Sequence, residues 1–186
     1  MRLSEPRIPP LPEAEWSDEI REMLPKAAPD EASAAAPLHI FTTLARHPKL
    51  LKRWLVFGAH VLGKSTLPAR ERELVILRTG WLCQSQYEFH QHTRIGRACG
   101  LTPDEIRRTT RGADAWTGRD AVLIRAADEL HADQMIGDET WRALRESFGE
   151  QQILDLIFAI GQYTLVSMVL NSLGVQTEDG SREFLP

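Results

Sequence analysis

The sequence predicts a single domain built from helices. Its 186 residues fit one domain, and a chain of this length buries a substantial core. From about residue 38 onward apolar residues recur at helical spacing, whereas the alternation of a half-buried strand never persists. Hydrophobic residues make up 42% of the chain and charged residues 26%, which is ordinary for a globular protein. We therefore expect an all-α fold.

Residues 1–37 are expected to form a proline-rich N-terminal arm. Seven of the eleven prolines lie there, and proline fixes φ and removes a backbone donor, so most of the arm should be extended. One short helix is expected within it, because an apolar stripe runs through Trp16, Ile20, Met23 and Leu24. We expect the arm to pack against the body or against a neighbouring subunit.

Helix start and stop signals divide the rest of the chain. The expected helices cover residues 38–44, 48–63, 68–81, 85–99, 118–131, 138–148 and 151–173, and one more begins at Thr102. Thr102 and Glu105 form a capping box with Pro103 in the first turn. The helix after Pro68 is apolar nearly all round and should be buried. Residues 175–186 are polar and are expected to form a loose tail.

Charge and cysteine content favour a cytoplasmic protein that binds neither nucleic acid nor membrane. The net charge is −4, and no run of lysine and arginine predicts a nucleic-acid surface. Cys83 and Cys99 do not make a disulfide framework, and the N-terminus lacks the apolar core of a signal peptide. The segment 156–177 is uncharged but is interrupted by polar residues, so we interpret it as a core or subunit-interface helix.

A faint internal repeat suggests a duplicated helical unit. Ser85-Gln86-Tyr87-Glu88 resembles Gly161-Gln162-Tyr163-Thr164 at an offset of 76 residues. If the chain is duplicated, the first copy keeps the glutamate and a histidine four residues on. Chemistry would then lie in the first copy and packing in the second.

Four polar residues form the candidate site. On one helix Ser85, Glu88 and His92 lie at i, i+3 and i+7, which puts them on one face. A carboxylate beside an imidazole raises its pKa and orients the ring, as in a general base or proton shuttle near neutral pH. Glu73 lies in the preceding apolar helix, where a carboxylate must be paired or protonated. His92 or Glu88 is its expected partner.

Less specific interpretations of these residues remain open. A Glu–His pair four residues apart is common on exposed helices, where it contributes only tenths of a kcal/mol. Glu73, Glu88 and His92 could offer a carboxylate-rich metal site, but no second Glu-x-x-His motif supports one. His90 and His92 point in different directions on a helix and cannot chelate together. We therefore expect no metal.

Tyrosines and arginines near the site are candidates for substrate binding. Tyr87 and Tyr163, the only tyrosines, could either pack in the core or donate a hydrogen bond to a substrate carbonyl or carboxyl group. Three arginines flank the site in sequence: Arg70, Arg72 and Arg78. Arg72 could bind a substrate carboxylate, or it could form a salt bridge. Trp54 is expected to pack rather than to stack on a ligand.

The sequence resembles the carboxymuconolactone decarboxylase family. The resemblance is carried by Arg70-Glu71-Arg72-Glu73-Leu74-Val75-Ile76-Leu77, by Tyr87-Glu88-Phe89 with His92, and by Ile95-Gly96 with Gly100-Leu101-Thr102. A later run, Ile160-Gly161-Gln162-Tyr163 with Asn171, extends it over most of residues 38–175. The resemblance implies an alkylhydroperoxidase D-like helical bundle and a homo-oligomer, either a trimer or a hexamer.

The chain departs from the redox members of this superfamily. Those members carry a glutamate, then a Cys-x-x-Cys motif, then a histidine four residues after the second cysteine. Glu73 and His92 match the glutamate and the histidine, but Ser85, twelve residues after Glu73, and Glu88 stand where the cysteines would be. Peroxide reduction needs a thiolate and a resolving thiol, so this site is not expected to carry it out.

The resemblance to the decarboxylase branch implies an acid–base enzyme without a cofactor. Its substrate would be a small carboxylated lactone or a carbonyl compound, and a decarboxylase or lyase reaction would release CO₂. The expected catalytic residues are His92 as proton shuttle, Glu88 as partner acid or base, Glu73 as orienting group and Ser85 as hydrogen-bond donor. Two alternatives are a non-catalytic ligand-binding or assembly protein on the same fold and residual thiol peroxidase activity through Cys83.

Overall fold

Helices make up the regular structure of the described residues. The computed structural model describes residues 3–24 and 37–181. The long helices are α3 (Pro48–Gly63), α4 (Ala69–Leu82), α5 (Gln86–Ala98), α7 (Gly118–Asp133) and α9 (Glu150–Leu173). The shorter ones are α1 (Asp18–Met23), α2 (His39–Leu44), α6 (Pro103–Arg108) and α8 (Asp138–Ser147), with 3-10 turns at Glu13–Glu15 and Ala113–Ala115. The all-α prediction is confirmed, and each expected helix is present within a few residues.

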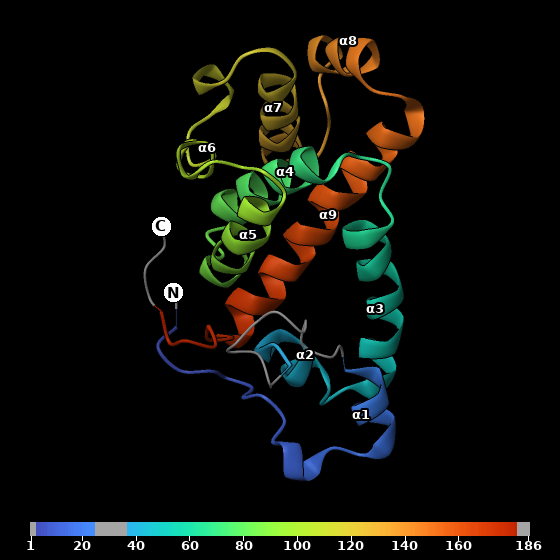
Figure 1. Cartoon of the computed structure of the whole chain (residues 1–186), viewed down its shortest axis with the longest axis vertical. Coiled ribbons are helices and arrows are strands. Elements are labelled where there is room, and N and C mark those ends of the chain that lie inside the picture. Colours follow the sequence, from blue (N-terminus) through green and yellow to red (C-terminus); the bar gives the residue numbers. More distant parts are fainter. Residues whose placement is uncertain (1–2, 25–36, 182–186) are drawn as a thin grey trace.

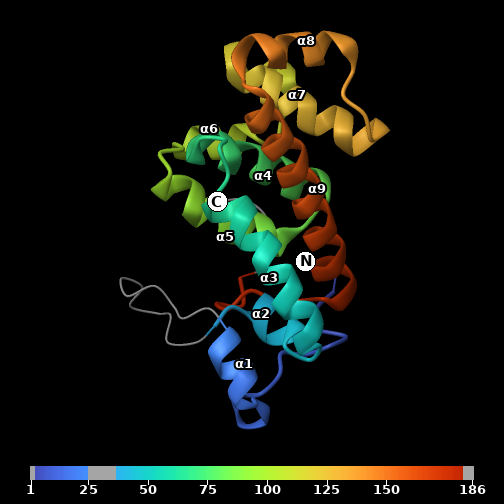
Figure 2. The same cartoon turned by 90° about the vertical axis from the view of Figure 1, so that its right-hand side faces the viewer.

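Two helices form the centre of the molecule. In Figure 1, α9 runs obliquely through the fold, with α4 and α5 on one side and α3 on the other. Helix α4 packs against α5, α7 and α9, and its residues 72–80 are all buried. Helix α3 also contacts α9, and the turned view in Figure 2 shows the two helices crossing. The apolar sequence after Pro68 therefore forms the central core helix, as expected.

The N-terminal arm packs against the body where the structure describes it. The amide of Arg7 donates to the Leu173 carbonyl at 2.8 Å, and buried Ile20 of α1 packs in a cluster with Leu51 of α3. Gly174 ends α9 with φ +67°, and a Cβ there would come within 2.8 Å of the Glu5 carbonyl oxygen. Glycine thus suits both the left-handed turn and the passing arm. Residues 25–36 of the predicted arm lie outside the described residues.

Two details of the sequence-based interpretation are wrong. The expected loose tail is packed over 175–181, since Val175 and Thr177 are buried and Glu178 bonds to α5; residues 182–186 lie outside the described residues. Tyr163 lies in the middle of the continuous α9, whereas Tyr87 lies at the start of α5. The two Gln-Tyr pairs therefore occupy different structural positions, which removes the support for a duplicated unit.

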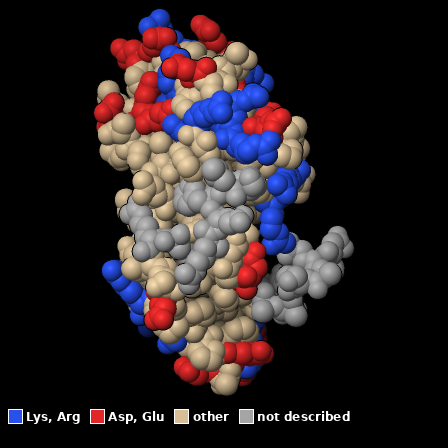
Figure 3. Space-filling model, turned by 90° about the vertical axis from the view of Figure 1, so that its left-hand side faces the viewer, with Lys and Arg blue, Asp and Glu red and all other residues tan. Residues whose placement is uncertain are grey.

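Helix α9 combines a buried face with an exposed apolar face. It is the one helix in the described ranges long and apolar enough to cross a membrane, but half of its apolar window is buried within the fold. Large apolar side chains on its outer face are Leu154, Phe158, Leu165 and Met168. On the face shown in Figure 3, charged side chains of both signs are most numerous at the upper end of the molecule, and others lie along its right-hand edge and at its lower end. The buried half fits the prediction of a core helix.

Candidate active site

A fully buried carboxylate lies at the base of the site. Glu73 of α4 has no solvent exposure. Its Oε2 lies 2.6 Å from Nδ1 of His92 on α5, and its Oε1 accepts a hydrogen bond from Nε of Arg72 at 3.1 Å. A buried carboxylate is tolerated only when its oxygens are paired, and both are paired here. Of the two partners expected for Glu73, the structure selects His92.

His92 lies between two carboxylates. Besides Glu73 at Nδ1, its Nε2 lies 3.3 Å from Oε2 of Glu88, one turn earlier on α5. Burial favours the neutral imidazole, but the two carboxylates outweigh it and raise the pKa of His92 to about 10. The ring is therefore an imidazolium at neutral pH. The two carboxylates thus place the pKa of His92 above the near-neutral value expected for a general base or proton shuttle.

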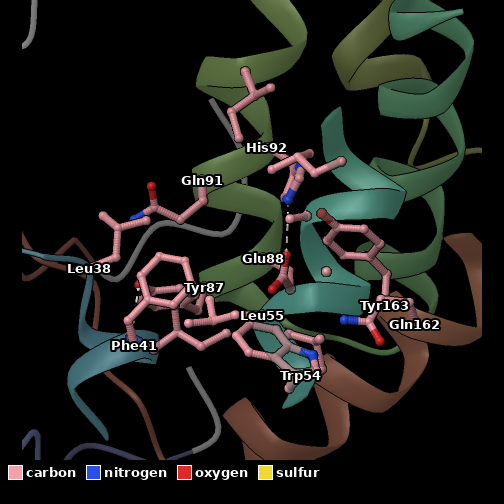
Figure 4. Close-up of a pocket in the computed structure, with 16 residues that line it drawn as sticks. Leu38, Phe41, Trp54, Leu55, Tyr87, Glu88, Gln91, His92, Gln162 and Tyr163 are labelled. Atoms are coloured by element: carbon pink, nitrogen blue, oxygen red, sulfur yellow. Dashed lines mark hydrogen bonds and ion pairs between the residues drawn. The ribbon is translucent and has the colours of Figure 1, made fainter. Parts of the chain in front are cut away.

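Tyr163 of α9 completes the polar end of the site. Its ring packs edge-on against the His92 ring, with centroids 4.7 Å apart and an interplanar angle of 85°. Burial, reinforced by the charges of Glu88 and Glu73, raises the pKa of Tyr163 well above its usual value. Figure 4 shows its hydroxyl directed towards the Glu88–His92 pair. Tyr163 thus keeps its proton and can donate a hydrogen bond to a ligand.

The polar end opens into an apolar cavity of about 300 Å³. A volume near this value is at the lower end for pockets that hold small molecules. Helices α2, α3, α5 and α9 contribute the walls, and Glu88, His92 and Tyr163 all line them (Figure 4). Glu73 and Arg72 lie behind His92 and do not line the cavity. The arrangement presents one carboxylate, one imidazolium and one phenol to an apolar cavity.

Ser85 and Tyr87 differ from their predicted roles. The Ser85 hydroxyl is buried without a hydrogen-bond partner in the described part of the chain, and the residue does not line the cavity. It lies at the N-cap of α5, two residues before Tyr87, the first residue of this helix that lines the cavity. The Tyr87 ring lines the cavity, but its hydroxyl donates to Glu178 at 2.6 Å and accepts from the Ile40 amide at 3.3 Å. Neither hydroxyl is directed to a ligand.

The flanking arginines form salt bridges, as the alternative interpretation proposed. Arg70 pairs with Asp120 and Glu105, Arg72 with Glu73, and Arg78 with Asp128. The pairs of Arg70 and Arg78 join α4 to α6 and α7, whereas the Arg72–Glu73 pair lies within α4. Their guanidinium groups are thus engaged by protein carboxylates, and none of the three lines the cavity.

Sequence reasoning missed one wall of the cavity. Trp54 was expected only to pack, yet it both packs against Phe41, with centroids 6.0 Å apart, and lines the cavity (Figure 4). The same face of α3 carries Leu55, Gly58, Ala59 and Leu62, at i, i+3, i+4 and i+7. The small residues within this stripe were the available signal, because they leave space between α3 and α9. Gln91 and Gln162 also line the cavity and had no distinguishing pattern.

Neither cysteine is part of this site. Cys83 is 3.8 Å from Nδ1 of His131, and neither cysteine lines the cavity. Burial, and then the charge of Glu73, raises the pKa of the Cys99 thiol. Over residues 3–24 and 37–181, the structure contains no group of three or more His, Cys, Asp or Glu side chains that could hold a metal ion.

The chain is similar to one protein family and to several solved structures. Residues 48–131 match the carboxymuconolactone decarboxylase family. A peroxidase-related protein from Ralstonia eutropha, with an alkylhydroperoxidase AhpD core, superposes with a TM-score of 0.79 at 22% identity, covering 92% of this chain and 93% of that one. A peroxidase-related protein from a Silicibacter species gives 0.71 at 16% identity, covering 94% and 97%.

A third structure is more distant, and no curated sequence matches. A protein of unknown function from Agrobacterium tumefaciens superposes with a TM-score of 0.67 at 18% identity, covering 72% of this chain and 94% of that one. No curated protein matches the chain significantly. At these identities the solved structures establish the shared helical fold. The match over 48–131 spans α3 to α7, and so includes Glu73, Glu88 and His92.

Proposed function

We propose that the chain is an acid–base enzyme that acts on a small lactone or carbonyl compound without a cofactor, as its match to the carboxymuconolactone decarboxylase family over residues 48–131 suggests. One observation carries this proposal. The Glu88 carboxylate faces an apolar cavity beside the protonated His92 and the un-ionised Tyr163. An acid, a base and a neutral donor at one end of an apolar cavity are the groups that proton transfer requires.

Glu88 is the proposed general base. Its carboxylate removes a proton from the carbon next to the substrate carbonyl, and the electron pair of that bond moves to the carbonyl oxygen. The Tyr163 hydroxyl donates a hydrogen bond to this oxygen, and the proton returns to carbon from Glu88 or His92. If the carbon carries a carboxylate, the bond to that group breaks instead, CO₂ leaves and His92 supplies the proton, which it regains from water.

Glu73 is a positioning residue in this scheme. It fixes the His92 ring through Nδ1 and stabilises the imidazolium, while Arg72 fixes Glu73. Nothing in the geometry gives Ser85 a step, because its hydroxyl lies outside the cavity. The proposal therefore keeps three of the four catalytic residues predicted from the sequence and adds Tyr163.

The test is a screen of lactones, ketones and unsaturated acids for CO₂ release and for incorporation of solvent deuterium at carbon. Glu88→Gln and His92→Asn should each lower turnover about 10²–10⁴-fold, the usual contribution of a positioned acid or base. His90→Asn is the matched control, since His90 lies on the same helix but pairs with Asp179 at 3.4 Å. Normal turnover by both site variants would refute the proposal.

One observation favours a second candidate, a thiol peroxidase. Cys83 lies beside the His131 imidazole, and two of the similar structures are described as peroxidase-related. A Cys83→Ser variant that loses peroxide consumption, with Glu88→Gln unaffected, would favour this candidate. Full lactone turnover after alkylation of both cysteines would favour the acid–base enzyme. Binding of lactones in the cavity without any turnover would instead identify a ligand-binding protein.

A further inference from the structure

The walls of the cavity are almost entirely uncharged. Within the described residues, no lysine or arginine lines it. Its apolar lining includes Phe41, Trp54, Leu55, Leu62 and Ile95. Its polar lining, apart from the tyrosines, consists of Glu88, Gln91, His92 and Gln162. A ligand that fills this space therefore buries most of its surface against carbon atoms.

The cation that does reach the cavity is already paired. His92 is held between Glu73 at 2.6 Å and Glu88 at 3.3 Å, so two carboxylates share one imidazolium. Arg72 neutralises Glu73 from behind and does not line the cavity. A substrate carboxylate would lie beside the Glu88 carboxylate without a free cation. Both the loss of hydration and the repulsion between like charges oppose such binding in a site of low dielectric constant.

Charged side chains of both signs line a neighbouring cavity instead. This second cavity, of about 600 Å³, shares Leu38 and Gln91 with the apolar cavity, and its charged or ionisable lining consists of Arg94, His39, His90, Glu13, Glu178 and Asp179. Gln91 donates to Glu178, which fixes the amide in the shared wall. Most of the charged side chains in this region therefore line the second cavity, and the first cavity is lined mainly by apolar residues.

We infer that the substrate is an uncharged, largely apolar lactone or ketone rather than a carboxylated one. The inference rests on the proposed function and narrows it, because a neutral substrate leaves proton transfer as the reaction and removes CO₂ loss. In that reaction the proton passes from carbon to Glu88 and back to the same or a neighbouring carbon. The step is balanced without an oxidant, a reductant or a second substrate.

Calorimetric titration with coumarin and with coumarin-3-carboxylate tests this inference without depending on turnover. Both are compact lactones, and they differ by one carboxylate. Coumarin should bind at least about tenfold more tightly to the full chain, and Leu62→Lys should tighten binding of the carboxylate at least about tenfold by adding the missing cation. Leu50→Lys is the matched control: Leu50 is also a partly exposed leucine on α3, but it does not line the cavity.

Each outcome has a defined meaning. Equal or tighter binding of the carboxylate by the wild-type chain overturns the inference, as does binding of neither compound at millimolar concentration. An equal gain in the Leu50→Lys control would show that the cavity does not decide charge preference, and it would also overturn the inference. Tight coumarin binding without turnover of any neutral lactone supports the inference while contradicting the proposed function. Release of CO₂ from a carboxylated substrate, abolished by His92→Asn, supports the proposed function while contradicting the inference.

Discussion

The imidazole Nδ1 of His92 lies 2.6 Å from Oε2 of Glu73, although the two residues are 19 positions apart and belong to different helices. The contact joins α5 to the core helix α4 at a point where neither side chain meets bulk water. It sets the charge state of His92, and with it the division of roles between His92 and Glu88. Several measurable consequences follow from this contact and from its surroundings.

Glu73→Gln should destabilise the protein by roughly 3–5 kcal/mol, because removing one partner leaves the charges of a buried pair uncompensated. The effect depends on pH with a defined sign. Since the folded state raises the pKa of His92 from 6.5 to about 10, this stabilisation is fully present below pH 6.5 and is lost as the pH rises through 10. Urea unfolding of both proteins at several pH values measures the difference. A difference that grows towards alkaline pH would contradict this assignment.

His92 should remain protonated throughout the physiological pH range. Its ring ¹⁵N resonances, assigned by their absence from His92→Asn, should stay constant between pH 6 and 8 and should move near pH 10. Glu88→Gln should lower the midpoint, since one of the two carboxylates that favour the imidazolium is removed. A midpoint near the ordinary value of 6.5 in the wild-type chain would refute the assignment of His92 as an acid.

Glu178→Ala should destabilise the fold by about 1–3 kcal/mol, because the buried Tyr87 hydroxyl and the Gln91 amide lose a charged acceptor. The free energy of unfolding in urea measures the effect. Glu150→Ala provides the control: Glu150 pairs with Arg145 on the surface, where side-chain exposures are 79% and 46%, so its loss should be close to neutral. Equal effects of the two substitutions on the free energy of unfolding would show that the contacts of Glu178 with α5 do not stabilise the fold.

The chain is expected to form a homo-oligomer, a trimer or a hexamer of 21.0 kDa subunits. The exposed apolar face of α9 is the proposed contact, because large exposed apolar patches commonly mark interfaces. Light scattering measures the mass, and a Phe158→Glu, Leu165→Glu variant should dissociate the oligomer while keeping its helical circular dichroism. Phe158 and Leu165 are 55% and 52% exposed, so the fold itself should tolerate the charges. A monomeric wild-type chain would contradict this expectation.

Local patterns were sufficient for most of the secondary structure. The capping box at Thr102 and Glu105 forms as predicted, and the apolar run after Pro68 became the buried α4. Such signals are readable because they depend on neighbours within one or two turns. The packed segment 175–181 was missed because its hydrogen bonds are made with α2 and α5, more than 80 residues earlier in the chain.

Local sequence patterns were enough to predict the helices and the contact between Glu88 and His92, since residues four apart on a helix must be neighbours. The protonation state of His92, in contrast, depends on contacts between helices. The pKa of His92 depends on the second carboxylate, Glu73, and on burial between α4 and α9, neither of which spacing along one helix can supply. Tertiary packing likewise removed Ser85 from the cavity and brought Tyr163 into it, because the distance between helices, rather than the order of residues, determines which side chains share a space.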